Sequence, residues 1–178
     1  MITLVAGGVR SGKSSFAESI FKEKQYVVYL ATSRFEDDEM KERIRIHQDS
    51  RPKEWRTFEG NYALTTAIGL ESHYLLDCLT VLTSNIMFDM TKDLELIDTK
   101  MQQTVEDTIC CELIHFIDQI QEKKFHLVIV TNEVGCAIVP EHHISRVYRD
   151  LLGRVNQRIA SLSDEVYFLF CGLPVKLK

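Results

Sequence analysis

The sequence predicts an α/β protein in which helices cover both faces of one mainly parallel β-sheet. Short apolar runs rich in valine, isoleucine and leucine alternate along the chain with longer stretches that carry apolar residues at helical spacing. Alternation of this kind is typical of βαβ units, in which a helix connects two parallel strands. Residues 126–131 (HLVIVT) are almost continuously apolar, as expected of a strand buried on both faces of a sheet.

The individual elements follow from these patterns. We expect strands at residues 2–6, 27–31, 74–76, 126–131 and 166–170. Helical patterns cover residues 13–23, 38–49, 60–70, 79–90, 101–123 and 141–162. The last pattern is the clearest, because its apolar residues form a single stripe that indicates a core-facing helix. Residues 89–107 are acidic and lack a clear apolar face, which predicts a surface insertion.

Composition indicates an ordinary globular protein. At 178 residues, 45% hydrophobic and 26% charged, residues 1–178 are expected to form a single domain. The apolar runs are shorter than the ~20 residues of a membrane span. The formal charge of −5 argues against a nucleic-acid-binding surface, which is usually basic. The five cysteines form no C-x-x-C pair, so we expect reduced thiols, a cytoplasmic location and no cysteine metal site.

A complete phosphate-binding motif, G-x-x-x-x-G-K-S, lies between the first strand and the first helix. It consists of Gly7, Gly8, Val9, Arg10, Ser11, Gly12, Lys13 and Ser14. Glycines allow successive backbone N–H groups to point at a phosphate near a helix N-terminus. Lys13 then reaches the β- and γ-phosphates, and the Ser14 hydroxyl can ligate Mg²⁺. The sequence therefore predicts a P-loop nucleoside triphosphate hydrolase-like (RecA-like) fold that binds a nucleoside triphosphate, rather than an ordinary glycine-rich turn.

A P-loop of this kind requires a carboxylate at the end of a neighbouring strand to hold Mg²⁺, directly or through water. Asp77 follows the strand at residues 74–76, and Glu133 follows the strand at residues 126–131. Either carboxylate could instead cap the segment after it, and for Asp77 the two roles are about equally expected. The candidate metal ligands are therefore Ser14 and Asp77, with Glu133 the weaker choice.

His47 lies in the last turn of the helical pattern at residues 38–49, on the face that it shares with Met40 and Ile44. A histidine in this place is more often a packing residue, or a charge stabilised by the helix dipole, than a catalytic group. Spacing alone therefore makes catalysis by His47 the minor alternative.

Further motifs run in order along the chain. They are Ala31-Thr32-Ser33, Asp37–Met40, Arg43-Ile44, His47, Arg51-Pro52, Trp55, Thr57–Glu59, Leu76–Thr80, Val130–Gly135, Ile138–Pro140, Arg149-Asp150, Gly153–Gln157, Asp164–Val166 and Gly172–Pro174. Together with the P-loop, this ordered set resembles the bifunctional adenosylcobinamide kinase/adenosylcobinamide-phosphate guanylyltransferase family. The match is thin only over residues 60–72 and 86–125.

The resemblance implies one nucleotide site that serves two reactions of cobalamin biosynthesis. The first is phosphorylation of adenosylcobinamide. The second is transfer of GMP from GTP onto adenosylcobinamide phosphate, which gives adenosyl-GDP-cobinamide. The resemblance assigns the transient guanylyl group to His47. This assignment is chemically reasonable, because neutral imidazole is a good nucleophile. Lys13, Mg²⁺ and Arg51 are expected to neutralise the leaving pyrophosphate.

Further implications concern contacts and assembly. The resemblance assigns additional nucleotide contacts to Thr32, Ser33, Arg51 and Glu59, with Glu59 accepting hydrogen bonds from guanine. It implies GTP as a substrate, ATP as an alternative donor for the kinase step, and a homotrimer with the corrinoid across the subunit interface. Alternative functions are a guanylyltransferase that has lost its kinase activity, a P-loop ATPase acting on nucleic acid, and a GTP-controlled switch without transfer chemistry.

Overall fold

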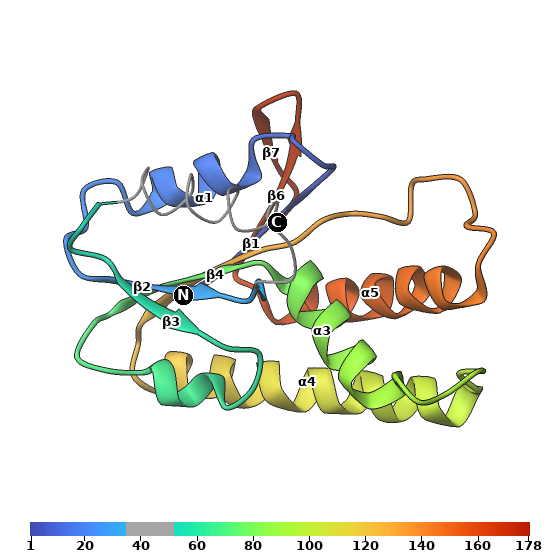
Figure 1. The fold of residues 1–178 in the computed structure, drawn as a ribbon. Coiled ribbons are helices and arrows are strands. Elements are labelled where there is room, and N and C mark those ends of the chain that lie inside the picture. Colours follow the sequence, from blue (N-terminus) through green and yellow to red (C-terminus); the bar gives the residue numbers. More distant parts are fainter. Residues whose placement is uncertain (35–51) are drawn as a thin grey trace.

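A computed structural model describes residues 1–34 and 52–178 of the chain. The predicted helix at residues 38–49, together with His47 and Arg51, lies outside the described residues. Within those residues, seven strands form one sheet in the order β3-β2-β4-β5-β1-β6-β7 (Figure 1). The strands are β1 (Ile2–Gly7), β2 (Val27–Ala31), β3 (Arg56–Glu59), β4 (His73–Asp77), β5 (His126–Val130), β6 (Glu165–Phe170) and β7 (Leu173–Lys176). All neighbouring strands pair in parallel except β6 and β7.

Helices cover both faces of this sheet, as predicted (Figure 1). One face is covered by α1 (Lys13–Ile20). The other is covered by α3 (Leu79–Thr91), α4 (Thr99–Glu122) and α5 (His143–Leu162). No helix of the described residues has the length and apolarity to cross a bilayer.

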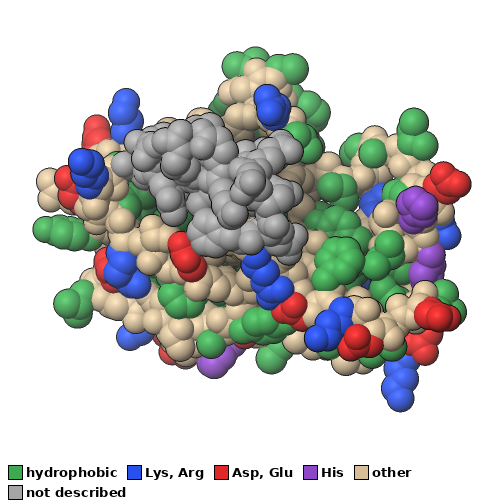
Figure 2. Space-filling model, viewed as in Figure 1, with side chains coloured by type: hydrophobic (Ala, Val, Ile, Leu, Met, Phe, Trp, Pro, Cys, Tyr) green, Lys and Arg blue, Asp and Glu red, His purple; other side chains and the backbone are tan. Residues whose placement is uncertain are grey.

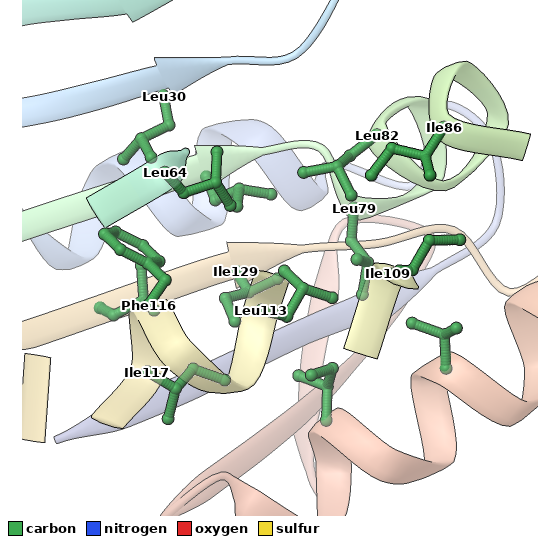
Figure 3. Packing of buried hydrophobic residues seen from close by; sticks show 14 of the residues in the cluster. Leu30, Leu64, Leu79, Leu82, Ile86, Ile109, Leu113, Phe116, Ile117 and Ile129 are labelled. Atoms are coloured by element: carbon green, nitrogen blue, oxygen red, sulfur yellow. The ribbon is translucent and has the colours of Figure 1, made fainter. Parts of the chain in front are cut away.

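Alternation along the strands divides the core into two clusters. Leu4 and Leu30 belong to the larger cluster, whereas Val5 and Tyr29 belong to the cluster beneath α1. Figure 3 shows part of the larger cluster, in which α4 side chains such as Phe116 and Leu113 pack between α4 and the sheet. Successive strand residues point to opposite faces, so the strands β1, β2, β4 and β5 are buried on both sides.

The carboxyl ends of the parallel strands meet at one edge of the sheet. Asp77 at the end of β4 pairs in register with Ala31 of β2 and Val130 of β5. Ala31 also pairs with Glu59 at the end of β3. In open α/β sheets ligands bind outside this edge, so the register brings the ends of four strands to one prospective site.

Three elements of the structure differ from the sequence predictions. The strands β3 and β7 were not predicted, because both are short and mostly exposed and therefore lack an apolar run. The predicted helix at residues 60–70 is reduced to one 3₁₀ turn, Leu64–Ala67, whose first amide donates to Glu112 Oε1 at 2.6 Å.

The predicted surface insertion at residues 89–107 also contributes to the core. Ile97 and Val105 are buried in the larger cluster. Residues 99–107 form the first turns of α4, and the Asp98 side chain caps them by accepting from the amide of Met101 at 2.7 Å. The acidic side chains of this segment lie mostly on its exposed positions, before α4 as well as on it.

Candidate nucleotide-binding site

The P-loop forms the turn from β1 into α1. Gly12 adopts a left-handed conformation, with φ of 93°, at the N-cap of α1. Gly7 has no room for a side chain, because a Cβ atom there would lie 2.8 Å from both the Leu169 carbonyl oxygen and Ser11 Oγ. Glycine is therefore required at both places for the chain to turn sharply at the end of β1.

Two segments far along the chain brace the P-loop. The amide of Gly172, between β6 and β7, donates to the Ser11 carbonyl at 3.0 Å, and the amide of Glu133 donates to the Gly7 carbonyl at 3.1 Å. Close packing accompanies the first contact, since a Cβ atom on Gly12 would lie 3.3 Å from Gly172 Cα. The conformation of the loop thus depends on β5 and on the β6–β7 hairpin as well as on its own glycines.

Lys13 is buried within the loop, with 8% of its surface exposed. Its ammonium donates to the Gly8 carbonyl at 2.5 Å. Burial lowers the pKa of Lys13, while the neighbouring Cys78 and Asp77 raise it. The Lys13 ammonium and the Asp77 carboxylate therefore belong to one electrostatic environment, although they are far apart in sequence.

Asp77 ends β4 and faces the same side of the sheet as α1. Two strand spacings separate β4 from β1, which corresponds to about 10 Å. The phenolic oxygen of Tyr29, two residues before the end of β2, donates to Asp77 Oδ2 at 2.8 Å. This bond holds one oxygen of the Asp77 carboxylate, and the N-cap of α3 at Cys78 makes no side-chain cap bond. A role of Asp77 in holding Mg²⁺ stays a prediction.

The oxygen donors at this edge suit a Mg²⁺ ion. Among residues 1–34 and 52–178, no three histidine, cysteine or acidic side chains gather to form a metal site. Mg²⁺ does not need such a cage, because it usually takes one or two protein oxygens together with phosphates and water. The half-buried Ser14 on α1 and Asp77 supply donors of that type.

Thr32 and Glu133 have structural roles that their sequence positions do not reveal. The Thr32 hydroxyl donates to the Cys78 carbonyl and accepts from the Cys78 amide, both at 2.9 Å. Thr32 therefore holds the turn that follows Asp77, and Ser33 beside it is half-buried. The Glu133 carboxylate accepts from the amide of Gly135 at 2.6 Å, so it stabilises its own turn.

Glu59 lies at the far end of the same sheet edge. Four strand spacings separate β3 from β1, which corresponds to about 19 Å. The Glu59 side chain is exposed, and the following amide of Gly60 donates to the Ala31 carbonyl at 3.2 Å. The structure thus brings Lys13, Ser14 and Asp77 together at one end and places Glu59 separately at the other.

A buried polar network at the end of β5 was not predicted. Thr131 Oγ1 donates to Asn156 Oδ1 at 2.8 Å, and Asn156 Nδ2 donates to the Asn132 carbonyl at 3.1 Å. Thr80 Oγ1 accepts from the Asn132 amide at 2.7 Å. This network joins α3, the end of β5 and α5. It includes the two residues before Glu133, whose amide donates to the P-loop at Gly7. The only sequence signal was the polar Asn156 on the otherwise apolar stripe of α5.

Comparison with known proteins agrees with this geometry. The family described as cobinamide kinase / cobinamide phosphate guanyltransferase matches residues 3–177. The chain is 40% identical to the bifunctional adenosylcobalamin biosynthesis proteins CobU of Escherichia coli K12 and Salmonella typhimurium LT2, over the full length of all three chains. It is 34% identical to the protein CobP of Pseudomonas aeruginosa, covering 100% of this chain and 98% of that protein.

Among solved structures, a KaiC-like protein from Pyrococcus horikoshii OT3 is similar with a TM-score of 0.44 and 11% identity, covering 94% of this chain and 71% of that one. The extent of the sequence matches is the stronger finding, because they run through the P-loop, Asp77 and the C-terminal hairpin alike. The chain therefore belongs to the cobinamide kinase / cobinamide phosphate guanyltransferase family.

Proposed function

We propose that this chain phosphorylates adenosylcobinamide and then transfers GMP from GTP onto adenosylcobinamide phosphate, at one nucleotide site. The product of the second reaction is adenosyl-GDP-cobinamide, for cobalamin biosynthesis. The observation that carries the proposal is the braced P-loop, whose buried Lys13 shares its environment with Asp77 in a chain of this family.

In the kinase reaction, the P-loop amides and Lys13 bind the triphosphate and stabilise the charge that develops during transfer. Ser14 and Asp77 would hold Mg²⁺, which supplies further charge neutralisation when it is bound. The phosphate donor is GTP or ATP. Phosphoryl transfer proceeds through a loose transition state, so positioning of the substrate hydroxyl matters more than a strong general base.

In the guanylyltransferase reaction, His47 is the nucleophile. A ring nitrogen of His47 forms a bond to the α-phosphorus of GTP as the bond to pyrophosphate breaks. An oxygen of adenosylcobinamide phosphate then attacks the same phosphorus, and the nitrogen–phosphorus bond breaks. Arg51 and Lys13 neutralise the departing pyrophosphate. His47 and Arg51 lie outside the described residues, so these roles rest on family membership and sequence position.

Covalent labelling tests the second reaction. Protein incubated with α-labelled GTP and Mg²⁺, then denatured, is expected to carry label that survives base and is lost in acid, as a phosphoramidate does. His47→Ala should take no label. His115→Ala, which changes an exposed histidine on α4, should label like the wild type. Wild-type protein that binds GTP without taking label would contradict the guanylyltransferase mechanism.

Transfer of γ-label to adenosylcobinamide tests the first reaction separately. We expect transfer from the wild type and from His47→Ala, because the kinase step does not use the histidine. A complete lack of transfer by the wild type, with covalent labelling intact, would favour the alternative of a guanylyltransferase without kinase activity.

The proposal extends to assembly and location. We infer a homotrimer of single-domain chains, with the corrinoid across the subunit interface, in the cytoplasm. Five cysteines, an odd number with no C-x-x-C pair, suit a reducing compartment. A role in nucleic-acid binding is disfavoured. On the described part of the face seen in Figure 2, acidic and basic side chains are interspersed and do not form one basic surface.

A further inference from the structure

Tyr29 lies in the middle of β2 and is buried beneath α1, with 3% of its surface exposed. It pairs in register with Leu75, two residues before Asp77 on the neighbouring strand. Residues two apart on a strand point to the same face, so the Tyr29 ring lies below the Asp77 side chain. Its hydroxyl then reaches Asp77 Oδ2 at 2.8 Å.

This hydrogen bond does more than satisfy a buried phenol. The acceptor is a carboxylate, and hydrogen bonds to ionised groups are shorter and stronger than those between neutral groups. A bond to one carboxylate oxygen limits rotation of the side chain about its Cβ–Cγ bond. The ring itself is held in the cluster that contains Val27, Leu75 and Val128, so the donor has little freedom to move.

The backbone that carries Asp77 is held from the same strand. Thr32, three residues after Tyr29, uses its hydroxyl to donate to and accept from the Cys78 backbone at 2.9 Å. In turn, Asn85 of α3 donates to the Thr32 carbonyl at 2.8 Å. β2 therefore fixes both the main chain after Asp77 and the orientation of its carboxylate.

We propose that Tyr29 is a positioning residue, which holds the Asp77 carboxylate in the orientation needed for Mg²⁺ at the P-loop. The inference rests on the proposed function, in which Asp77 assists the metal. Removing a group that orients a metal-binding carboxylate typically lowers metal affinity or activity by about 10–100-fold.

The test is Tyr29→Phe, which removes the hydroxyl and leaves the ring in place. Binding of the α,β-methylene analogue of GTP, which cannot release pyrophosphate, is measured by calorimetry without Mg²⁺ and over a Mg²⁺ titration. We expect affinity without Mg²⁺ to change less than about twofold, and the Mg²⁺ concentration for half-maximal effect to rise about 10-fold.

A matched control is available on β6. The Tyr167 hydroxyl donates to Glu165 Oε2 at 3.2 Å, and its ring packs on the same α1-side cluster. Glu165 pairs with Thr3 near the start of β1, at the opposite end of the strand from the P-loop. Tyr167→Phe removes the same atom outside the site and should leave the Mg²⁺ titration unchanged.

Asp77→Asn separates this inference from the proposed function. If Asp77→Asn shifts the Mg²⁺ titration and Tyr29→Phe does not, Tyr29 has no positioning role although the metal role of Asp77 stands. If Asp77→Asn has no effect, the metal role of Asp77 fails and the inference fails with it. A loss in Tyr29→Phe that is equal with and without Mg²⁺ would also refute the inference, because it indicates general damage to the site.

The double variant completes the test. If Tyr29 acts through Asp77, adding Tyr29→Phe to Asp77→Asn should shift the Mg²⁺ titration no further than Asp77→Asn alone. Additive shifts would mean that the tyrosine acts by another route, and would overturn the inference.

Discussion

At the scale of single residues, Lys13 shares its electrostatic environment with Asp77, and the Asp77 carboxylate accepts a hydrogen bond from Tyr29. Lys13 and Asp77 were predictable, because a P-loop lysine and a carboxylate after a neighbouring strand have recognisable positions. Tyr29 was not, since a tyrosine in an apolar strand gives the same pattern whether or not its hydroxyl reaches a carboxylate. The Thr32 hydroxyl bonds to the Cys78 backbone, a contact that no local pattern reveals, and the nucleotide contact assigned to Thr32 by the resemblance stays a prediction.

His126, at the amino end of the sheet, predicts how stability depends on pH. Its Nε2 lies 3.1 Å from Thr3 Oγ1, and its ring packs edge-on against Phe21 with centroids 4.9 Å apart. The pKa of His126 is lowered to about 4, mainly by burial and also by the positive charges of the amino terminus and His73, while Glu165 and Asp164 oppose the shift. The folded protein therefore binds the proton less well than the unfolded chain.

Stability should consequently be complete above about pH 6.5, the ordinary pKa of histidine, and fall as the pH drops towards 4. Urea unfolding of wild type and His126→Gln over this range checks the prediction. The variant should lose less stability on acidification, whereas His115→Gln on exposed α4 surface should behave like the wild type. Parallel curves for wild type and His126→Gln would contradict the assignment.

At the scale of elements, the periodicity found the long helices and the buried strands, and it failed where an element is short or exposed. Residues 60–70 carry apolar side chains at helical spacing, yet Ala63 adopts a left-handed conformation with φ of 52° and only one 3₁₀ turn forms. The apolar side chains of this segment are buried against α4, although the segment itself does not form an α-helix. β7 contains Pro174 and is exposed throughout, which suits an edge strand but gives no apolar pattern.

Two glycines in the turn from β1 into α1, Gly7 and Gly8, are expected to differ in how they tolerate alanine. Alanine at Gly7 would bring its Cβ within 2.8 Å of the Leu169 carbonyl oxygen, whereas no described atom lies within 4 Å of a Cβ at Gly8. Gly7→Ala is expected to lower the free energy of unfolding by about 1–3 kcal/mol, through backbone strain and the clash. Gly8→Ala should stay within about 0.5 kcal/mol of the wild type. Chemical denaturation measures both, and equal stabilities would show that β6 does not constrain the loop.

At the scale of the whole molecule, a mainly parallel sheet with helices on both faces followed from the sequence, but the strand order and the contacts between distant segments did not. The brace from Gly172 to Ser11 joins the two ends of the sequence, and nothing in the P-loop motif indicates it. Gly153 lies inside the continuous helix α5, and no described atom lies within 4 Å of a Cβ built there. The reason for a glycine at this position therefore lies outside the described residues of a single chain.

The proposed trimer supplies such a reason. Gly153 lines a cavity of about 600 Å³ between α5 and the sheet, together with Arg149, Arg154 and Gln157. If another subunit packs here, light scattering should give a mass three times the 20.6 kDa of the chain. Gly153→Arg should lower this mass, and Ser161→Arg, at an exposed position of the same helix, should not. A monomeric wild type would contradict the proposed assembly.

The hydrogen bond between Gly172 and Ser11 also has a consequence for how the protein is made. During translation, residues 7–14 leave the ribosome long before the hairpin that fixes their shape. A nascent chain should therefore be unable to hold GTP until residues 170–176 have emerged, so the nucleotide can aid folding only after that point.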